Sequence, residues 1–461
     1  MFWESCDPQL DAKPCLIDGA TVWTYQEVFA AADALYEAQE PGVVALLCDR
    51  TVDTVVAYLG ALRKGCVPLL LDAGLRPEAL ARALDAYTPD FVFAAESALP
   101  GNWDVVRGFG DGTLFAAKGG QSRPPLHPDL TLLLPTSGST GDPKCVRLSA
   151  RNIQSCTDDI CRYLAMTSDR RAISLLPLHY SYGLSVLHSV LNSRASFVVT
   201  RLTVLDRDFW TLMEEAGVTD FSAVPFIFET IRRMRLSEGV LNTLQCVTQA
   251  GGRLDPRFTR HFSEIFAAAG IRYFTMYGQT EASPRISYLP PEAAAEKLGS
   301  VGVPLSCGEV MLAETGAASG EGELVYKGPN VCMGYARCRA DLSAGDDLNG
   351  VLHTGDQARI DEDGYIFIVG RRKRFIKLQG TSVNLDYVET VLKSRDIECI
   401  VVGRENRILI CHMQADDAVL ARVMADNFTF HPSSGRYKNL PELPLNASGK
   451  PDYALVSEEY L

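Results

Sequence analysis

The sequence predicts an α/β protein: a large N-terminal domain of parallel, helix-covered sheets with a small β-subdomain, then a small α+β C-terminal domain. Three observations lead to this fold class. The 461 residues exceed what one hydrophobic core supports, so at least two domains are expected. The first part alternates continuous apolar runs with helical segments, which is typical of parallel strands buried on both faces. After Pro304 the pattern changes to short strands and Gly-rich turns, which indicates a separate β-rich part.

The N-terminal region supplies the first of these elements. The apolar run at 42–48 predicts a strand, followed by a helix at 52–63, a strand at 67–71, a helix at 77–87 and a strand at 91–94. The alternation resumes further along the chain, with helices between the strands. These later strands are expected at 131–134, 172–177, 196–200, 219–224, 244–249 and 271–276.

Residues 100–128 are rich in Gly, Pro and Asp, and we interpret them as a linker across the surface. Short strands around 322–328 and 363–369 are expected to form the β-subdomain.

The C-terminal part is predicted to be a compact α+β unit. Its clearest helix is expected at 384–394, and a strand at 400–402 is expected to pair with 408–412. We therefore place the domain boundary between residues 370 and 371, with 1–370 as one domain and 371–461 as the other.

The composition excludes several classes of function. There are 44 basic and 57 acidic residues, and the net charge of −13 argues against a nucleic-acid surface or an anionic membrane surface. Thirteen cysteines occur without a CxxC pair, which fits reduced thiols in a cytosol. We find no signal peptide and no apolar stretch of membrane-helix length, so a cytoplasmic location is expected.

The most informative segment is Leu134-Pro-Thr-Ser-Gly-Ser-Thr-Gly-Asp-Pro-Lys144, which follows an apolar strand. Glycines let a backbone approach an anion closely, and exposed N–H groups and hydroxyls can then bind phosphate oxygens. The segment is not a Walker A loop, and no GxGxxG accompanies it. An ordinary Ser/Gly-rich surface turn is the alternative interpretation.

Several motifs follow downstream in a fixed order. They are Tyr277-Gly-Gln-Thr-Glu281, His353-Thr-Gly-Asp356, Gly370-Arg-Arg-Lys373 with Lys377 and Gly380, and Asn446-Ala-Ser-Gly-Lys450. The series closely resembles the AMP-forming adenylating enzymes: acyl-CoA synthetases, peptide-synthetase adenylation domains and beetle luciferases. The resemblance covers about residues 20–453, and within that family the chain is most like a stand-alone acyl- or aryl-CoA ligase.

The resemblance implies an ATP site. Tyr277 would stack on adenine, Gly251-Gly252-Arg253 would cover its other face, and Asp356 with Arg371 would bind the ribose hydroxyls. Taken alone, Asp356 also fits a turn carboxylate that caps its own loop. The residues that the resemblance assigns to ATP are Thr136, Ser137, Gly138, Ser139, Thr140, Gly141, Lys144, Gly251, Gly252, Arg253, Tyr277, Gly278, Gln279, Asp356 and Arg371.

The same resemblance implies three catalytic residues. Glu281 would supply the carboxylate for Mg²⁺, Thr280 would bond the α-phosphate, and Lys450 would stabilise the charge that develops during displacement. Lys373 matches the hinge about which a mobile C-terminal domain would alternate between two half-reactions. Lys377 and Gly380 would face the entering thiol.

The acid pocket departs from the family pattern. The segment 177–184 resembles the one that opens the pocket, but Tyr180 takes the usual histidine place. The aspartate that holds the α-ammonium in amino-acid-activating relatives is missing, so we expect an acid without an α-amine, and a largely apolar one. Ordinary core packing is the alternative for the aromatic residues. The residues assigned to the pocket are Tyr180, Tyr182, Gly183, Phe226 and Ala250.

These features together predict an ATP-dependent carboxylic-acid ligase that forms an acyl-adenylate and pyrophosphate and then transfers the acyl group to a thiol. The expected cofactors and partners are ATP, Mg²⁺, a small carboxylic acid and CoA, with neither nucleic acid nor membrane. CoA is favoured because no carrier domain is attached and the residues expected on the thiol side, Lys377 and Gly380, are intact. Two alternatives stay open: an enzyme that loads a carrier protein or forms an amide, and a non-catalytic nucleotide-binding partner subunit.

Overall fold

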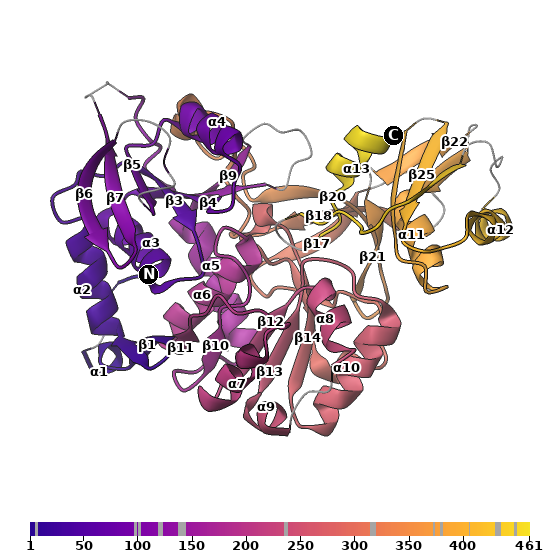
Figure 1. The fold of residues 1–461 in the computed structure, drawn as a ribbon, viewed down its shortest axis with the longest axis horizontal. Coiled ribbons are helices and arrows are strands. Elements are labelled where there is room, and N and C mark those ends of the chain that lie inside the picture. The colour runs from indigo at the N-terminus through magenta and orange to yellow at the C-terminus, as the bar shows by residue number, and fades with distance from the viewer. Residues whose placement is uncertain are drawn as a thin grey trace. The chain divides into compact units, whose positions relative to one another are not determined.

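The computed structural model shows two compact units (Figure 1). The first consists of Met1–Ser137, Asp142–Glu309 and Lys327–Leu352, and the second contains Val310–Tyr326 and His353–Leu461. The described residues are 1–4, 8–95, 99, 103–118, 123–136, 144–234, 238–313, 320–371, 374–378, 381–404, 406–428, 435–446 and 450–461. The boundary expected at residue 371 concerns a functional pivot, and it stays a prediction.

The first unit contains two large mixed sheets. In the described residues one has eight strands, in the order β19-β9-β8-β4-β3-β5-β7-β6, and its centre is parallel. Its strands are β3 (Val43–Cys48), β4 (Val67–Asp72), β5 (Phe91–Ala94), β6 (Trp103–Phe109), β7 (Gly112–Ala117), β8 (Leu130–Pro135), β9 (Cys145–Ser149) and β19 (Gly334–Ala336).

The second sheet has nine strands within the described ranges, in the order β16-β15-β14-β13-β12-β10-β11-β1-β2. The six central strands run parallel to one another: β14, β13, β12, β10, β11 and β1. Antiparallel strands form the two edges, with β15 and β16 at one and β2 at the other. Its strands are β1 (Pro14–Asp18), β2 (Thr21–Thr24), β10 (Arg171–Ile173), β11 (Ser196–Val198), β12 (Asp220–Ala223), β13 (Cys246–Gln249), β14 (Arg272–Tyr277), β15 (Ser287–Leu289) and β16 (Val303–Pro304).

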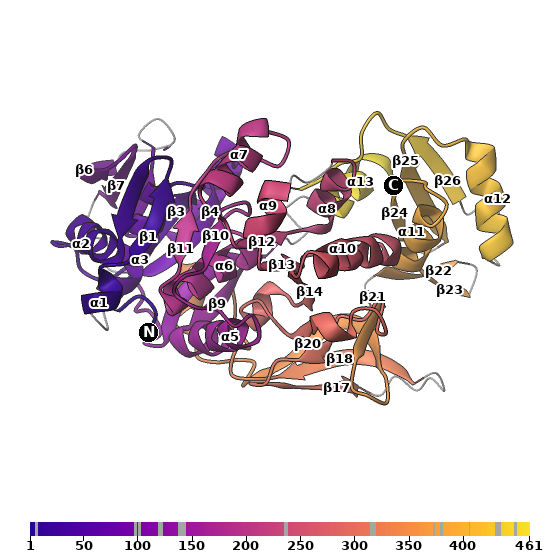
Figure 2. The same cartoon turned by 90° about the horizontal axis from the view of Figure 1, so that it is seen from below.

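Helices cover both faces of each sheet. Helices α3 and α5 pack on the eight-stranded sheet, α2 and α6 pack on the nine-stranded sheet, and the two pairs meet in one core between the sheets. Figure 2 shows α10 beside β13 and β14 on the outer face of the nine-stranded sheet. The helices of this unit are α1 (Pro8–Asp11), α2 (Tyr25–Leu35), α3 (Val52–Lys64), α4 (Pro77–Tyr87), α5 (Ala150–Tyr163), α6 (Ser181–Ser193), α7 (Arg207–Glu215), α8 (Pro225–Ile231), α9 (Glu238–Thr243) and α10 (Pro256–Ala268).

Strand β3 shows why the central strands are apolar throughout. Val44 and Leu46 belong to the core between the sheets, whereas Val43 and Ala45 pack on the opposite face, in the cluster that includes α4. Because successive side chains point to opposite faces, a strand with helices on both sides needs apolar residues at every position. The predicted helices at 52–63 and 77–87 and the strand between them are confirmed.

The linker predicted at 100–128 is wrong in its central part. Strands β6 and β7 form an antiparallel hairpin, and β7 pairs with β5 at the edge of the eight-stranded sheet. The Gly110-Asp111 pair makes the two-residue turn, with Gly110 at a positive φ of 59°. Leu114 and Phe115 are buried, so the Gly and Asp residues mark a hairpin turn and not a linker.

The second unit combines a β-sheet with a smaller α+β part. In the described residues the four-stranded sheet has the order β17-β18-β20-β21, a two-stranded hairpin follows, and the last sheet has the order β24-β25-β26. The strands are β17 (Glu309–Ala313), β18 (Glu321–Lys327), β20 (Val351–Ile360), β21 (Ile366–Arg371), β22 (Phe375–Leu378), β23 (Thr381–Asn384), β24 (Cys399–Arg404), β25 (Arg407–His412) and β26 (Gly435–Asn439).

Three helices complete the described part of this unit. Helix α11 packs on one face of β24, and α13 packs on the other. The expected pairing of 400–402 with 408–412 and the helix expected at 384–394 are confirmed. The helices are α11 (Leu385–Lys393), α12 (Asp417–Asn427) and α13 (Tyr453–Tyr460).

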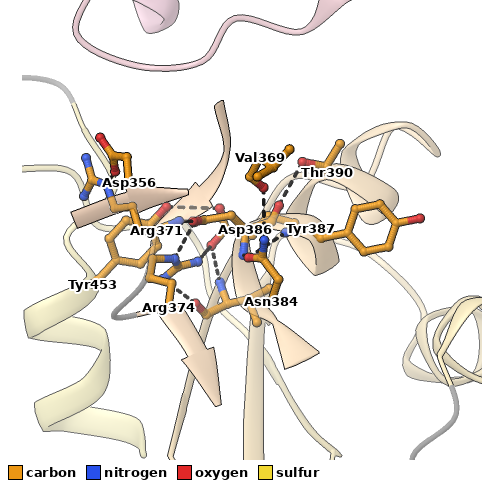
Figure 3. Close-up of polar contacts among 11 residues, drawn as sticks. Asp356, Val369, Arg371, Arg374, Asn384, Asp386, Tyr387, Thr390 and Tyr453 are labelled. Atoms are coloured by element: carbon orange, nitrogen blue, oxygen red, sulfur yellow. Dashed lines mark hydrogen bonds and ion pairs between the residues drawn. The ribbon is translucent and has the colours of Figure 1, made fainter. Parts of the chain in front are cut away.

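A buried ionic network holds the α+β part together around Arg374 (Figure 3). Its guanidinium pairs with Asp386 and with Glu389, at 2.7 Å for the second, and also donates to the carbonyl of Val401 at 3.0 Å. Glu389 accepts from Tyr453 OH at 3.0 Å and from the backbone N–H of Val401 at 2.8 Å. Burial raises the pKa of Glu389, although Arg374 opposes this shift. Arg374 therefore supplies a close counter-charge for Glu389, which is a buried carboxylate.

We expect Arg374→Met to destabilise the second unit by about 3–5 kcal/mol, because Glu389 would lose its buried counter-charge. All four tryptophans, at positions 3, 23, 103 and 210, belong to the first unit. When Arg374→Met is titrated with urea, circular dichroism should therefore detect unfolding of the second unit at low urea concentration. Tryptophan fluorescence should not change at that concentration.

The loss of stability in Arg374→Met should be largest at neutral pH. It should shrink as the pH falls, because protonation of Glu389 removes the uncompensated charge. The exposed Arg395→Met is the matched control. Equal stability of the two variants would contradict the structural role of Arg374.

Candidate functional site

The base of the Ser/Gly loop is closed by the two residues that flank it. Thr136 follows β8 and Lys144 precedes β9, and these two strands are antiparallel neighbours. The backbone N–H of Thr136 donates to the carbonyl of Lys144 at 3.0 Å, and Thr136 Oγ1 donates to the same carbonyl at 3.3 Å. The predicted phosphate-binding residues inside the loop lie outside the described residues: Ser137, Gly138, Ser139, Thr140 and Gly141.

One tyrosine joins the loop lysine to the predicted metal carboxylate. Lys144 Nζ lies 3.3 Å from the centre of the Tyr335 ring, and Tyr335 OH donates to Glu281 Oε1 at 2.9 Å. Burial raises the pKa of Tyr335, as does the nearby Glu281, so the hydroxyl stays protonated and donates. Residues far apart in the sequence therefore form one arrangement with a cation, a donor and a carboxylate.

Backbone contacts fix the turn that carries Thr280 and Glu281. These residues lie in the 3₁₀ helix η2 (Thr280–Ala282), and the carbonyl of Glu281 accepts from the N–H of Cys332 at 2.8 Å. Asn330 donates through Nδ2 to the carbonyls of Ala282 and Arg285, at 2.8 Å each.

The residues before this turn are held as tightly. Tyr277 ends β14, and Gln279 precedes η2; both are half-buried. At Gly278 a Cβ would lie 1.9 Å from the carbonyl oxygen of Pro284, so only glycine fits there. The side chain of Thr280 reaches Ser181 at the start of α6, with 3.2 Å between their hydroxyl oxygens.

The Gly-Gly-Arg segment after β13 lies against Tyr180. Gly251 has a φ of 86°, and a Cβ there would lie 2.3 Å from Tyr180 OH, so a side chain is excluded twice over. Gln249 is buried and donates through Nε2 to the carbonyl of Gly252 at 2.9 Å, while Arg253 is exposed.

Of the predicted pocket residues, Tyr182 lines an internal cavity with room for about one water. Its hydroxyl donates to the carbonyl of Thr248 at 3.0 Å. Tyr180 lies edge-on to it, Ala250 is buried, and Gly183 is close enough to Pro177 to exclude a Cβ. Phe226 is 47% exposed on α8. Their roles towards an acid stay predictions.

The second unit carries the remaining predicted residues. Asp356 pairs with Arg371 across β20 and β21, with 3.6 Å between Oδ1 and Nε (Figure 3). Lys450 is anchored by its backbone, whose N–H donates to Asn446 Oδ1 at 3.1 Å. Burial and the nearby Arg371 lower the pKa of Lys450 to about 8. Lys373 and Gly380 lie outside the described residues, and Lys377 is described only by its backbone in β22.

The donor set fits Mg²⁺ bound together with a nucleotide. Across the described ranges, no cluster of three or more His, Cys, Asp or Glu side chains could hold a metal without help. Magnesium commonly takes one or two carboxylates and completes its shell with phosphate oxygens and water. A single orienting contact on Glu281 suits that mode of binding.

Every helix in the described part of the chain is too short or too polar to span a bilayer.

Comparison with known proteins identifies the family. Residues 2–336 match the family model described as AMP-binding enzyme. The chain belongs to the AMP-binding enzyme family. It is an ATP-dependent, AMP-forming acid–thiol ligase, and the sequence-based recognition of this family is confirmed.

Relatives match this AMP-binding enzyme over nearly its whole length. A protein of Humulus lupulus named as a probable CoA ligase is 26% identical and covers 98% of this chain and 94% of its own. The 2-succinylbenzoate–CoA ligase of Geobacillus kaustophilus is 27% identical, covering 94% and 92%.

The structure of o-succinylbenzoate CoA synthetase from Bacillus subtilis, in complex with its acyl-adenylate intermediate, gives a TM-score of 0.77 at 24% identity and covers 95% and 94%. That likeness confirms the predicted two-part α/β fold.

Two residues of this AMP-binding enzyme stand out only in the structure, Tyr335 and Arg285. Tyr335 follows Gly334 in a short apolar strand, and nothing in its neighbourhood distinguishes it from a core tyrosine. Arg285 follows Glu281 by four residues in a segment that is otherwise buried. That burial is known only from the structure, so no signal in the sequence marked Arg285.

Proposed function

We propose that this ligase activates a small carboxylic acid with ATP and Mg²⁺ and transfers the acyl group to CoA. The observation that carries the proposal is the arrangement of Lys144, Tyr335 and Glu281. It gathers a cation and a carboxylate at the mouth of a Ser/Gly loop, as a nucleotide–metal complex requires. CoA as acceptor is supported by the full-length relative named as a probable CoA ligase.

In the first step, one oxygen of the acid attacks the α-phosphorus of ATP, and the bond to pyrophosphate breaks. Both reactants are anions, so repulsion and positioning form most of the barrier. Lys144 and the loop donors bind the β- and γ-phosphates, and Thr280 bonds the α-phosphate. Mg²⁺ neutralises phosphate charge when it is bound at Glu281. Tyr277 and the segment 251–253 hold adenine.

The second unit supplies the remaining groups. Asp356, oriented by Arg371, accepts hydrogen bonds from the ribose hydroxyls, and Lys450 balances the charge that develops during displacement. For the second step, the domain that begins at residue 371 pivots at Lys373 and presents Lys377 and Gly380 to the thiol. The reaction takes place in the cytoplasm, which is consistent with the absence of disulfides among the described cysteines.

The acid is small, and its identity does not carry over from relatives that differ at most positions. The 2-succinylbenzoate named for the Geobacillus relative is a dicarboxylic acid. A screen of pyrophosphate release over carboxylic acids, with and without CoA, tests the proposal. We expect release with a narrow set of acids, and thioester when CoA is present.

Two other outcomes of this screen would replace the proposal. In the first, the adenylate forms but the acyl group is transferred only to an added carrier protein as a thioester, or only to an added amine as an amide. That result would establish the alternative of an enzyme that loads a carrier protein or forms an amide. No release with any acid would favour the non-catalytic partner subunit.

We predict that Tyr335→Phe raises the Mg²⁺ concentration for half-maximal pyrophosphate release by about 10-fold, because Glu281 loses the donor that orients it. The ring beneath Lys144 remains in this variant, so the KM for ATP should change less. Tyr87→Phe is the matched control, since Tyr87 OH donates to the carbonyl of Ala336, next to Tyr335. Unchanged Mg²⁺ dependence in Tyr335→Phe would refute the orienting role.

We predict that kcat/KM for pyrophosphate release falls as the pH rises through about 8, where Lys450 of the enzyme without substrate loses its proton. The pKa of this lysine is lowered, so the ammonium form is fully present only below that pH. The kcat profile should fall at higher pH, because bound triphosphate favours the charged form. Lys450→Arg should abolish the fall, since arginine stays charged. A kcat/KM that is flat from pH 7 to 9.5 would contradict the assignment.

A further inference from the structure

Arg285 is a buried cation without a carboxylate partner among the described residues. It is 2% exposed, and its Nε has no hydrogen-bond partner. Its guanidinium carbon lies 5.2 Å from the centre of the Tyr182 ring. Tyr163 forms a side-chain hydrogen bond with it, and Tyr163, Tyr182 and Cys156 interact with it electrostatically. Burial raises the pKa of all three groups, so none of them carries a negative charge at neutral pH.

The backbone around Arg285 leaves it little freedom. Its N–H donates to the carbonyl of Ala282 at 3.0 Å, and its own carbonyl accepts from Asn330 at 2.8 Å. Both backbone hydrogen-bonding groups of Arg285 are therefore engaged, and the start of its side chain is held in place.

Arg285 lines the cavity described above, together with Tyr182, Ser185, Ser222, Thr248 and Met276. The hydroxyls of this wall are satisfied locally, with Ser222 and Thr248 2.8 Å apart and Ser185 donating to the carbonyl of Tyr182 at 2.7 Å. They do not neutralise a cation.

One carboxylate, Asp220, also lines the cavity, but it is already engaged. Arg170 binds it with Nε at 2.7 Å and Nη2 at 2.5 Å, and Thr219 donates to it at 2.5 Å. The Asp220–Arg170 pair is neutral, and the positive charge of Arg285 stays uncompensated in the cavity wall.

Two short stretches of chain connect the cavity wall with the turn that carries Thr280. The wall residue Tyr182 follows Ser181, which contacts the Thr280 hydroxyl, and Arg285 itself follows the η2 turn. An acid whose reacting carboxylate lies at Thr280 can therefore extend its other end towards Arg285.

A buried charge without a partner is costly, and a protein that retains one commonly uses it to bind an opposite charge. We propose that Arg285 determines substrate specificity by pairing with a second carboxylate on the acid, so that the preferred substrate is a dicarboxylic acid. This inference rests on the proposed acid activation and names the class of acid for that site.

The cavity indicates a compact acid. It has room for about one water, and Met166 and Met276 lie in its wall. Methionine side chains repack at low cost, so the cavity can widen for a carboxylate without backbone movement. The apolar walls expected from the sequence would then contact the carbon skeleton between the two carboxylates.

The test compares acids that differ only at the far end. Pyrophosphate release is measured with glutarate against pentanoate, and with terephthalate against 4-methylbenzoate, over a series of chain lengths. The wild-type enzyme should favour the best dicarboxylic acid over its methyl-ended partner by about 100-fold in kcat/KM, because the partner leaves Arg285 unpaired. Arg285→Met should abolish or invert this preference.

Stability separates a ligand-binding arginine from a structural one. Without acid, Arg285→Met should raise the melting temperature, because an unpaired buried charge is replaced by an apolar chain. Dicarboxylic acids should raise the melting temperature of the wild type but not of the variant. Arg170→Met is the matched control and should lower the melting temperature, since it leaves Asp220 buried alone.

Three results would overturn the inference. The first is a wild-type preference for monocarboxylic acids. The second is an equal loss of kcat/KM with both members of each acid pair in Arg285→Met. The third is a melting temperature of Arg285→Met that falls as far as that of Arg170→Met. Release with monocarboxylic acids alone would leave the proposed ligase function intact. Failure with every acid would instead reject that function.

Discussion

The site in the first unit depends on how the segment from Asn330 to Tyr335 clasps the turn after β14. Asn330, fully buried, donates to the carbonyls of Ala282 and Arg285. Two residues later Cys332 donates to the carbonyl of Glu281, and Tyr335 reaches the carboxylate of the same residue. One short segment thus fixes the backbone of the turn, the direction of its carboxylate and the place of its arginine. A buried amide satisfied at two acceptors makes such a clasp specific as well as stable.

The clasp is itself anchored by Arg147 on β9. The side chain of Arg147 is fully buried, donates to the carbonyls of Met333 and Tyr335 at 3.1 Å each, and pairs with Asp347. Because β9 also carries the returning end of the Ser/Gly loop, the same arginine ties the loop base to the clasp. The mixed edge of the eight-stranded sheet therefore places Lys144 opposite Glu281. An all-parallel edge would send the chain away from the site.

Two buried arginines in the first unit illustrate opposite uses of the same side chain. Arg170 neutralises Asp220 with two hydrogen bonds and so closes a polar defect in the core. Arg285 has no such acid within the described residues, and its charge is directed at a cavity. In the first arrangement the buried charges compensate each other without a ligand. The second is favourable only when an anion is present, which is what selective binding requires.

The sequence by itself determined the fold class, the strand and helix alternation, and the family, because apolar periodicity and ordered motifs are local properties of the chain. It also singled out Lys144 and Glu281, which the structure places in contact with one tyrosine that the sequence did not single out. Only the tertiary structure brought Tyr335 and Arg285 to the site, because their partners are distant in the sequence. Glu281 is 54 residues from Tyr335, and the groups around the Arg285 side chain lie on helices α5 and α6. The hairpin at 103–117 was misread for a similar reason: its pairing with β5 is a long-range contact. Burial and pairing decide whether a charge is structural or functional, and neither can be read from residue order.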